Sequence, residues 1–318
     1  MRVRDWKRTL VALLGSKARR KSGDVTPLAQ APSRRSNAAP QSPITRSEVD
    51  ARAAEAADLA LCEGATPRTM TALQEALEAA RAVLAAGGGS DDRRRLSMLR
   101  WRQAAVLAAG GDTQAALASC REAIALARQV LQETPADDHD FDAIVGEFGT
   151  RANDLSRLLL AAGIPDEARK LLDESDQATQ RSEGPAAKRA RAGTMFVMVN
   201  TLADEVFEAR REGRKSEADP SVAIASALSL VQMRRSIATE DDPTTLFDLA
   251  ESLEVLATLY AVVPQPQSAM DAFSEAYFIF SRFSGPAAKE RTELMLKHMG
   301  RLGKAFPGLR VRMHLPGR

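Results

Sequence analysis

One cluster in the sequence combines the residue types of a metal or acid–base site. It is the run Asp137-Asp138-His139-Asp140, which precedes a segment with a helical pattern. Acidic residues occupy the same place before two other such segments, at positions 91–92 and 240–242. Carboxylates at that place cap free N–H groups and complement the helix dipole. We therefore interpret all three runs as helix caps and do not predict a metal site.

The remaining side chains that could do chemistry do not form a recognisable motif. His298 falls on the polar side of the last helical segment, where we expect it to be solvated, and His314 lies in a basic tail. Cys62 and Cys120 lie in Ala- and Leu-rich stretches, where we expect both thiols to pack as small apolar groups. Two cysteines make neither a disulfide framework nor a complete tetrahedral metal site. Because phosphate-loop and nucleophile motifs are also absent, we predict a protein that is not an enzyme and has no cofactor.

The composition predicts an all-α protein. Hydrophobic residues make up 44% of the 318 residues but aromatic residues only 4%, so Ala and Leu supply most of the apolar content. Ala and Leu favour helices, whereas strands favour aromatic and β-branched residues. No stretch approaches the roughly 20 apolar residues of a membrane span, and we expect a soluble protein.

Residues 1–46 form a basic arm. They carry eleven basic and two acidic side chains, a net charge of +9, while the rest of the chain has a net charge of −7. Within residues 3–14 one helical face carries apolar side chains and the other arginines, and a Pro-, Ser- and Arg-rich stretch that we expect to be disordered follows. The apolar side chains are Val3, Trp6, Leu10, Leu13 and Leu14.

Four interpretations of the arm stay open. It is an anionic-membrane contact, an import or secretion signal, a helix that docks on a partner, or an inert tail. The membrane or partner contact would use Arg4, Trp6, Lys7 and Arg8.

An internal echo indicates a repeat. The segment Arg181-Ser-Glu-Gly-Pro-Ala-Ala-Lys188 returns 101 positions later as Arg282-Phe-Ser-Gly-Pro-Ala-Ala-Lys289. The same offset carries Ala168 onto Ala269 and Leu172 onto Phe273. One register shared by two helical segments and a Gly-Pro junction predicts a duplicated supersecondary unit.

Gly and Pro punctuation divides residues 47–305 into five helix pairs and a capping helix, followed by a basic tail at 306–318. The predicted helices span residues 47–62, 68–86, 91–109, 113–134, 139–162, 165–182, 186–213, 219–239, 243–262, 266–283 and 286–305.

Within three pairs, small and large residues alternate in a fixed order around a turn. The second pair has Ala104, Leu107, Gly111, Ala116, Cys120 and Ala123; the third has Ser156, Leu159, Gly163, Ala168, Leu172 and Ser175; the fifth has Ala257, Tyr260, Pro264, Ala269, Phe273 and Ala276. This pattern resembles the tetratricopeptide repeat, although the steps of 43 to 57 residues exceed the 34 of that family. The resemblance implies a right-handed solenoid of antiparallel helix pairs in which small residues occupy the helix crossings.

The resemblance also implies a function. A solenoid of this family presents the first helix of each pair along a concave groove that holds a peptide or partner helix. Carried onto this sequence, the groove positions are Trp101, Arg102, Asn153, Arg157, Asn200, Glu254 and Thr258.

We therefore predict a cytoplasmic scaffold or adaptor that binds a protein or peptide. The alternative is a delivered factor, imported into an organelle such as the mitochondrion or secreted, with residues 1–46 as its address. Local basic clusters keep nucleic acid open as a partner, but the acidic body and the scarcity of aromatic residues argue against it.

Overall fold

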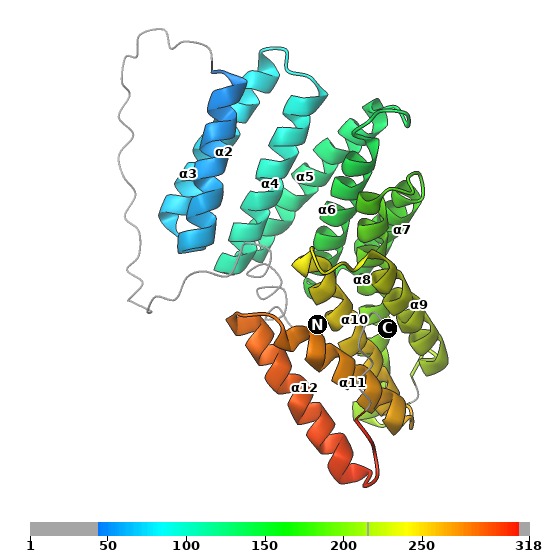
Figure 1. Cartoon of the computed structure of the whole chain (residues 1–318). Coiled ribbons are helices and arrows are strands. Elements are labelled where there is room, and N and C mark those ends of the chain that lie inside the picture. Colours follow the sequence, from blue (N-terminus) through cyan, green and yellow to red (C-terminus); the bar gives the residue numbers. More distant parts are fainter. Residues whose placement is uncertain (1–43, 215, 312–318) are drawn as a thin grey trace. The chain divides into compact units, whose positions relative to one another are not determined.

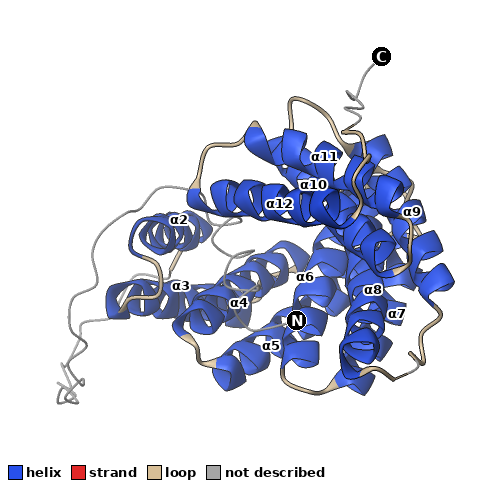
Figure 2. Cartoon of the chain, turned by 90° about the horizontal axis from the view of Figure 1, so that it is seen from below, coloured by secondary structure: helices blue, strands red, loops and turns tan. Residues whose placement is uncertain are grey.

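The computed structural model describes residues 44–214 and 216–311, and every regular element in these ranges is an α-helix (Figures 1 and 2). The eleven helices of the described residues are α2 (Arg46–Glu63), α3 (Pro67–Ala85), α4 (Ser90–Gly110), α5 (Thr113–Glu133), α6 (Phe141–Ala161), α7 (Pro165–Thr179), α8 (Pro185–Glu212), α9 (Pro220–Ile237), α10 (Pro243–Val262), α11 (Pro266–Ser281) and α12 (Pro286–Ala305). Their ends lie within three residues of the predicted ones, and the all-α prediction is confirmed.

The helix starts follow from local chemistry. Seven helices, α3 and α7 through α12, have a proline in the first turn, where its missing N–H costs nothing. Asp242 caps α10 by accepting a hydrogen bond from the Thr244 N–H, and Asp92 accepts one from the Gly89 N–H at the start of α4. The cap interpretation is wrong for Asp140, whose side chain makes no cap bond to α6. There the Asp138 carboxylate accepts a bond from the Asp140 N–H and stabilises the preceding turn.

The described residues divide into two units at a point within α5, between Leu126 and Ala127. The first unit holds α2, α3, α4 and the first part of α5, with a core that includes Val49, Leu77 and Leu99. The Ser97 hydroxyl of α4 donates to the Ala123 carbonyl of α5 at 2.7 Å, which ties these two helices together.

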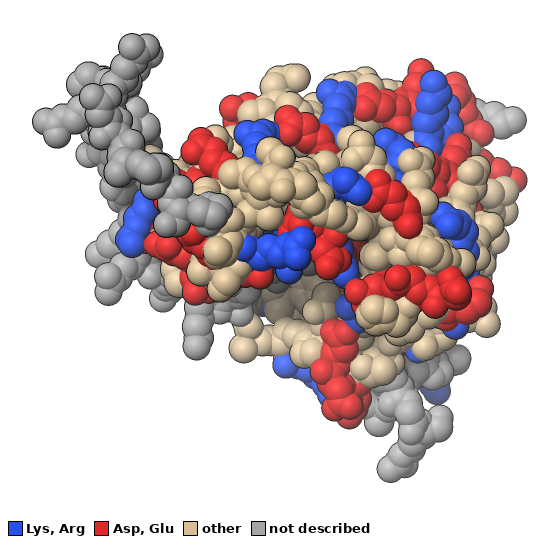
Figure 3. Space-filling view, turned by 90° about the horizontal axis from the view of Figure 1, so that it is seen from above, with Lys and Arg blue, Asp and Glu red and all other residues tan. Residues whose placement is uncertain are grey.

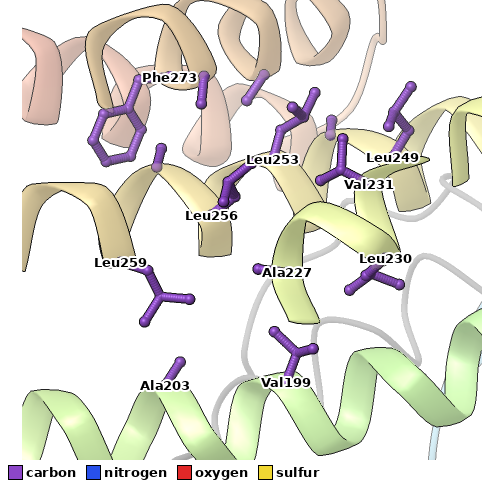
Figure 4. Packing of buried hydrophobic residues seen from close by; sticks show 14 of the residues in the cluster. Val199, Ala203, Ala227, Leu230, Val231, Leu249, Leu253, Leu256, Leu259 and Phe273 are labelled. Carbon is purple, nitrogen blue, oxygen red and sulfur yellow. The ribbon is translucent and has the colours of Figure 1, made fainter. Parts of the chain in front are cut away.

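In the second unit each helix packs on its neighbours in sequence. Helix α6 contacts α7, α8 contacts α9, α10 contacts α11, and α11 contacts α12. Contacts also join alternate helices, since α6 packs on α8 and α8 reaches α10. The core of α8–α12 is drawn in Figure 4, where Val199 of α8, Leu230 of α9 and Leu253 of α10 lie among the buried side chains.

The small residues predicted at the helix crossings are fully buried. Their exposed fraction is 0% at Ala104, Ala116, Ala123, Ser156, Ala168, Ser175, Ala257, Ala269 and Ala276. A larger side chain at such a position would force apart two helices that already pack at interior density. The burial expected for these small residues is therefore confirmed.

Helices α6 and α8 approach each other especially closely. A Cβ atom added to Gly146 would lie 2.7 Å from the Ala186 Cβ, and one added to Gly149 would lie 2.8 Å from the Ala190 Cβ. On the α8 side, a Cβ on Gly193 would lie 2.7 Å from the Asn153 side-chain nitrogen. The glycines are required here because the two backbones leave no room for a methyl group.

Two expectations about single residues are corrected. Cys120 is buried as predicted, but Cys62 is exposed near the end of α2 and does not pack in the core. His298 is not simply solvated, since its ring stacks on Phe273 with 5.1 Å between the ring centroids. Burial lowers the pKa of His298, and the nearby charges of Arg301 and Lys297 lower it further.

Other predictions fall on residues that the structure does not describe. The arm helix at residues 3–14 and His314 lie outside the described ranges. Among the helices from Arg46 to Ala305, none combines the length and the apolarity of a bilayer-spanning segment.

Candidate partner-binding face

A set of polar and aromatic side chains comes from alternate helices of the second unit, the first helices α6, α8 and α10 of three pairs and the last helix α12. We call it the first-helix face. It consists of Asp154 and Arg157 of α6, Phe196 and Asn200 of α8, Glu251, Glu254 and Thr258 of α10, and Arg291 of α12. Five of the seven groove positions predicted from the sequence lie in this unit, and four of them, Arg157, Asn200, Glu254 and Thr258, belong to the face.

Arg157 links α6 to α8. Its Nη1 donates to the Asp154 carboxylate at 3.4 Å, and its guanidinium carbon lies 5.7 Å from the centroid of the Phe196 ring. An arginine over an aromatic face is held by the ring quadrupole, with about 0.5–2 kcal/mol depending on solvent access. The Arg157 Nε is buried and no described group accepts a hydrogen bond from it. Its position is therefore fixed by the aromatic ring as much as by ion pairing.

Arg291 links α12 to α10. Its Nη1 lies 2.9 Å from both carboxylate oxygens of Glu254, and its Nη2 lies 3.3 Å from Glu251. The side chains are mostly covered, with 25% of Arg291, 16% of Glu251 and 15% of Glu254 exposed. Removing one partner of such a pair leaves the other charge poorly solvated, so the arginine holds α12 against α10.

Glu251 lies at the electrostatic centre of the face. Burial raises the pKa of Glu251, and the neighbouring Asp248 raises it further. Arg291, which bonds to Glu251, acts in the opposite direction, as do the charges of Arg157 on α6 and Arg234 on α9. Charges from four helices therefore meet at this position.

Arg234 of α9 is a buried member of this cluster. Its side chain is 5% exposed and its Nη1 lies 2.5 Å from the Asp248 carboxylate. Burial lowers the pKa of Arg234 and Asp248 opposes that shift, but an arginine still stays protonated at any physiological pH. The sequence analysis did not identify this pair. The available signal was a charged residue inside an otherwise apolar helical run.

Asn200 follows Phe196 by one turn of α8 and Thr258 follows Glu254 by one turn of α10, and each makes one side-chain hydrogen bond within its own helix. The Asn200 side-chain nitrogen donates to the Phe196 carbonyl at 2.9 Å, and the Thr258 hydroxyl donates to the Glu254 carbonyl at 2.8 Å. Both side chains are partly exposed. The Asn200 amide oxygen accepts no hydrogen bond from any described residue, so it can still accept one from a peptide N–H.

Asn153 occupies a different place from the other predicted positions. It is 4% exposed and its side-chain nitrogen donates to the Ala190 carbonyl at 2.9 Å. Its amide oxygen accepts from the Thr194 hydroxyl at 2.9 Å, and that hydroxyl is also bonded to Ser175. The amide is therefore used between α6 and α8 and is not presented to a ligand in this structure.

Trp101 and Arg102 belong to the other unit, on α4. Both are partly exposed, and the Arg102 Nη1 donates to the Ala53 carbonyl of α2 at 3.3 Å. The arm residues Arg4, Trp6, Lys7 and Arg8 lie outside the described ranges.

The basic clusters that kept nucleic acid open are largely paired with acids. Arg95 lies 3.0 Å from Asp50, Arg189 bonds to Asp242, and Arg214 lies 2.9 Å from Glu205. On the face drawn in Figure 3, basic and acidic atoms are interspersed without a continuous basic patch.

His139 shows what the acidic run before α6 does. Its side chain is 89% exposed, with Asp138 at 3.3 Å and Asp140 at 3.6 Å from its ring nitrogens. Among the described residues, no three His, Cys, Asp or Glu side chains are grouped as a metal site.

Comparison with known proteins does not assign the chain. No protein-family model matches it, and no curated protein matches its sequence.

Proposed function

We propose that this protein is a non-enzymatic scaffold of tetratricopeptide-like architecture, a right-handed solenoid that holds a segment or helix of a partner protein on the first-helix face. The support is the alternate-helix packing, in which α6 contacts α8 and α8 contacts α10, together with fully buried small residues at the crossings. In such an architecture the first helices line one continuous surface.

The observation that carries the proposal is the pairing of four non-consecutive helices through side chains of the first-helix face. Arg157 of α6 makes a cation–π contact with Phe196 of α8, and Arg291 of α12 pairs with Glu254 and Glu251 of α10. The charge of Arg157 also lowers the pKa of Glu251, which relates the two contacts. The face offers an aromatic ring, both signs of charge and the Asn200 amide. An extended peptide needs these groups, since its backbone takes hydrogen bonds and its side chains take apolar and charged contacts.

Affinity capture with matched variants tests the proposal. The bait is the chain lacking residues 1–43, carrying either Asn200→Arg or Thr258→Arg. Both substitutions place a long charged side chain on the face without removing a core residue. The control is Thr201→Arg, an exposed position next to Asn200 that points about 100° around α8.

We expect Asn200→Arg and Thr258→Arg to capture at least tenfold less partner than the unmodified bait. Thr201→Arg should capture the same amount as the unmodified bait. All three should show the same helical circular dichroism and melting temperature. If the folded face variants capture every partner as well as the unmodified bait, the proposed binding face is wrong.

A further inference from the structure

Helix α12 has a side that no other described helix covers. The helix packs on α11 and is ion-paired to α10 through Arg291. After it, the backbone of Arg310 returns to the Gln267 side chain of α11. Five exposed residues fall within about 100° of the helix circumference and form what we call the open face of α12. They are Glu293, Leu296, Gly300, Gly303 and Lys304.

Nothing in the described chain requires the two glycines of the open face. Neither has the positive φ that favours glycine, and a Cβ atom on either would meet no atom of another element within 4 Å. In α6 the same spacing, Gly146 and Gly149, receives α8, where an added Cβ would lie 2.7 and 2.8 Å from the nearest side chains. Because glycine lowers the stability of a helix interior, a glycine pair on an exposed face favours the close approach of another helix.

On α8 the corresponding side is covered by helices. The 101-residue echo aligns the start of α8 with that of α12 and carries Val199 onto Gly300 and Ala203 onto Lys304. Val199 and Ala203 are buried, and Figure 4 shows them pointing toward α9 and α10. On α12 the same side carries Leu296 with 49% of its surface exposed. The open face is therefore a helix-packing side without its helix among the described residues.

The charges of the open face are complementary to those of a second copy. Glu293 and Lys304 lie on the same flank of α12 and no described residue forms an ion pair with either one. They are 11 residues apart, or about 16 Å along the helix, too far to pair within one chain. In an antiparallel pair of α12 helices, Glu293 of each copy lies opposite Lys304 of the other when Leu296 packs over Gly300 of the second copy. The complementarity therefore selects a second copy as the occupant and an antiparallel arrangement.

We propose that α12 pairs with α12 of a second copy to form an antiparallel, two-fold symmetric dimer. A two-fold contact uses the same patch on both copies, so each Glu293–Lys304 pair and each Leu296–Gly300 contact is made twice. One helix face buries less than the roughly 1,200 Å² of stable complexes, so we expect a weak dimer with a Kd of about 10–100 μM.

The dimer contact does not depend on the proposed function, since it uses a different side of the unit from the first-helix face. If both hold, the dimer carries two first-helix faces. A partner with two binding segments would then be held about 10²–10⁴ times more tightly than a partner with one.

Sedimentation equilibrium of the full chain tests the dimer at concentrations between about 2 and 300 μM. Glu293→Lys and Lys304→Glu should each weaken the dimer at least about fivefold, because each places two like-charged pairs across the contact. The double variant should restore the Kd to within about twofold of the original, as should an equal mixture of the two single variants. Arg301→Glu is the control, since it changes the charge of α12 as Lys304→Glu does but lies about 140° around the helix from Leu296. It should change the Kd less than about twofold.

Gly300→Leu tests the steric part of the contact. It should weaken the dimer at least about tenfold, because the added side chain fills the space that Leu296 of the second copy would occupy. The monomer should melt at an equal or higher temperature, since leucine favours a helix and the added Cβ meets no other element. Circular dichroism checks that each variant keeps its helices.

Three results would overturn the inference. A chain that stays monomeric at about 300 μM has no such dimer. A dimer that Gly300→Leu and the charge variants leave unchanged lies elsewhere on the molecule. A double variant as weak as the single variants would refute the antiparallel pairing of Glu293 with Lys304. Each of these results leaves the proposed function standing, because partner capture is tested by Asn200→Arg and Thr258→Arg on the first-helix face.

Discussion

Replacing Asn153 by alanine tests whether this amide is structural or available to a ligand. In the structure Asn153 bridges α6 and α8, with one bond to the Ala190 carbonyl and one from the Thr194 hydroxyl, both at 2.9 Å. Both residues are shielded from solvent, since Asn153 is 4% and Thr194 is 1% exposed. The substitution therefore removes two buried hydrogen bonds and leaves a space the size of an amide group.

The expected loss follows from these contacts. Each buried hydrogen bond contributes about 1 kcal/mol, and a partner left without an acceptor adds about 1–3 kcal/mol. The Thr194 hydroxyl keeps its contact with Ser175, which reduces that second cost. We expect Asn153→Ala to lower the free energy of unfolding by about 2–4 kcal/mol. For a cooperative unit of about 185 residues this corresponds to roughly 4–16 °C in melting temperature.

The assay is urea unfolding followed by circular dichroism, together with amide hydrogen exchange. Exchange is needed because two units need not unfold as one, and the loss should appear in slowly exchanging amides of α6 through α12 but not in those of α2, α3 and α4. Thr194→Val is the matched control, since it removes the hydroxyl and keeps the shape. In a double-mutant cycle the two substitutions should couple by at least about 0.5 kcal/mol.

A stability change within about 0.5 kcal/mol would refute this account, because exposed polar positions behave in that way. Loss of partner binding at unchanged stability would show that Asn153 faces the ligand and that the helix register described here is wrong.

Further predictions concern packing, pH and the last helix. Ala269→Leu should lower the free energy of unfolding by about 1–3 kcal/mol in urea titrations, since Ala269 is fully buried and a longer side chain overpacks its site. An unchanged unfolding midpoint would contradict the prediction that two helices cross closely at Ala269. Burial would raise the pKa of Asp142, but hydrogen bonds from Ser182 and from two N–H groups of α8 outweigh it and hold the pKa below its usual value. Because the folded-state pKa lies below the unfolded value of about 3.9, this carboxylate stabilises the fold above that pH and loses its contribution as the pH falls further. Asp142→Asn should therefore cost stability at pH 7 and cost less near pH 3, and a loss independent of pH would refute the assignment. Arg291→Met should increase amide exchange in α12 because Glu251 and Glu254 lose their shared partner; unchanged exchange would show that apolar contacts alone hold the helix.

The sequence was sufficient for the helices and for the packing within pairs. Gly and Pro at the joints define helix ends through backbone geometry alone, which explains the agreement to within three residues. Small residues at the crossings were predictable because a helix pair that packs closely has room for nothing larger at that point. Ala104, Ser156 and Ala257 illustrate this, since all three are fully buried.

It was less predictable which polar residues face the surface and which face a neighbouring helix. Adjacent positions on a helix differ by about 100°, so an uncertainty of one residue moves a side chain from the surface into an interface. Arg157 lies on the first-helix face, whereas Asn153, one turn earlier, points into α8. The signal that was overlooked is the pair Gly146 and Gly149 in a helix interior, which indicates that another backbone comes close on that side.

The echoed Gly-Pro junction explains why residues cannot be transferred between pairs by register alone. Gly184 and Gly285 both cap a helix whose first residue is proline, so the echo correctly marks two helix starts. Their reasons for being glycine differ. Gly184 has an ordinary φ of −70°, and a Cβ there would lie 2.1 Å from the Asp142 carboxyl carbon. Gly285 has a φ of 152°, which other residues rarely adopt.

A pair of substitutions separates these two causes. Gly184→Ala should displace the Asp142 carboxylate from its bonds to Ser182, Ala186 and Ala187 and cost about 1–3 kcal/mol, of the size of a lost helix cap. In an Asp142→Ala background the obstacle is gone, so Gly184→Ala should cost only a few tenths of a kcal/mol. Gly285→Ala should cost the same in both backgrounds, because its penalty includes backbone strain at a φ of 152° and does not depend on Asp142. Equal costs of Gly184→Ala in the two backgrounds, measured by urea unfolding, would mean that Asp142 does not occupy the space beside Gly184. Gly184 and Gly285 would then be conserved between the two repeats for the same backbone reason. Residues matched between helix pairs by sequence could in that case be expected to make the same contacts.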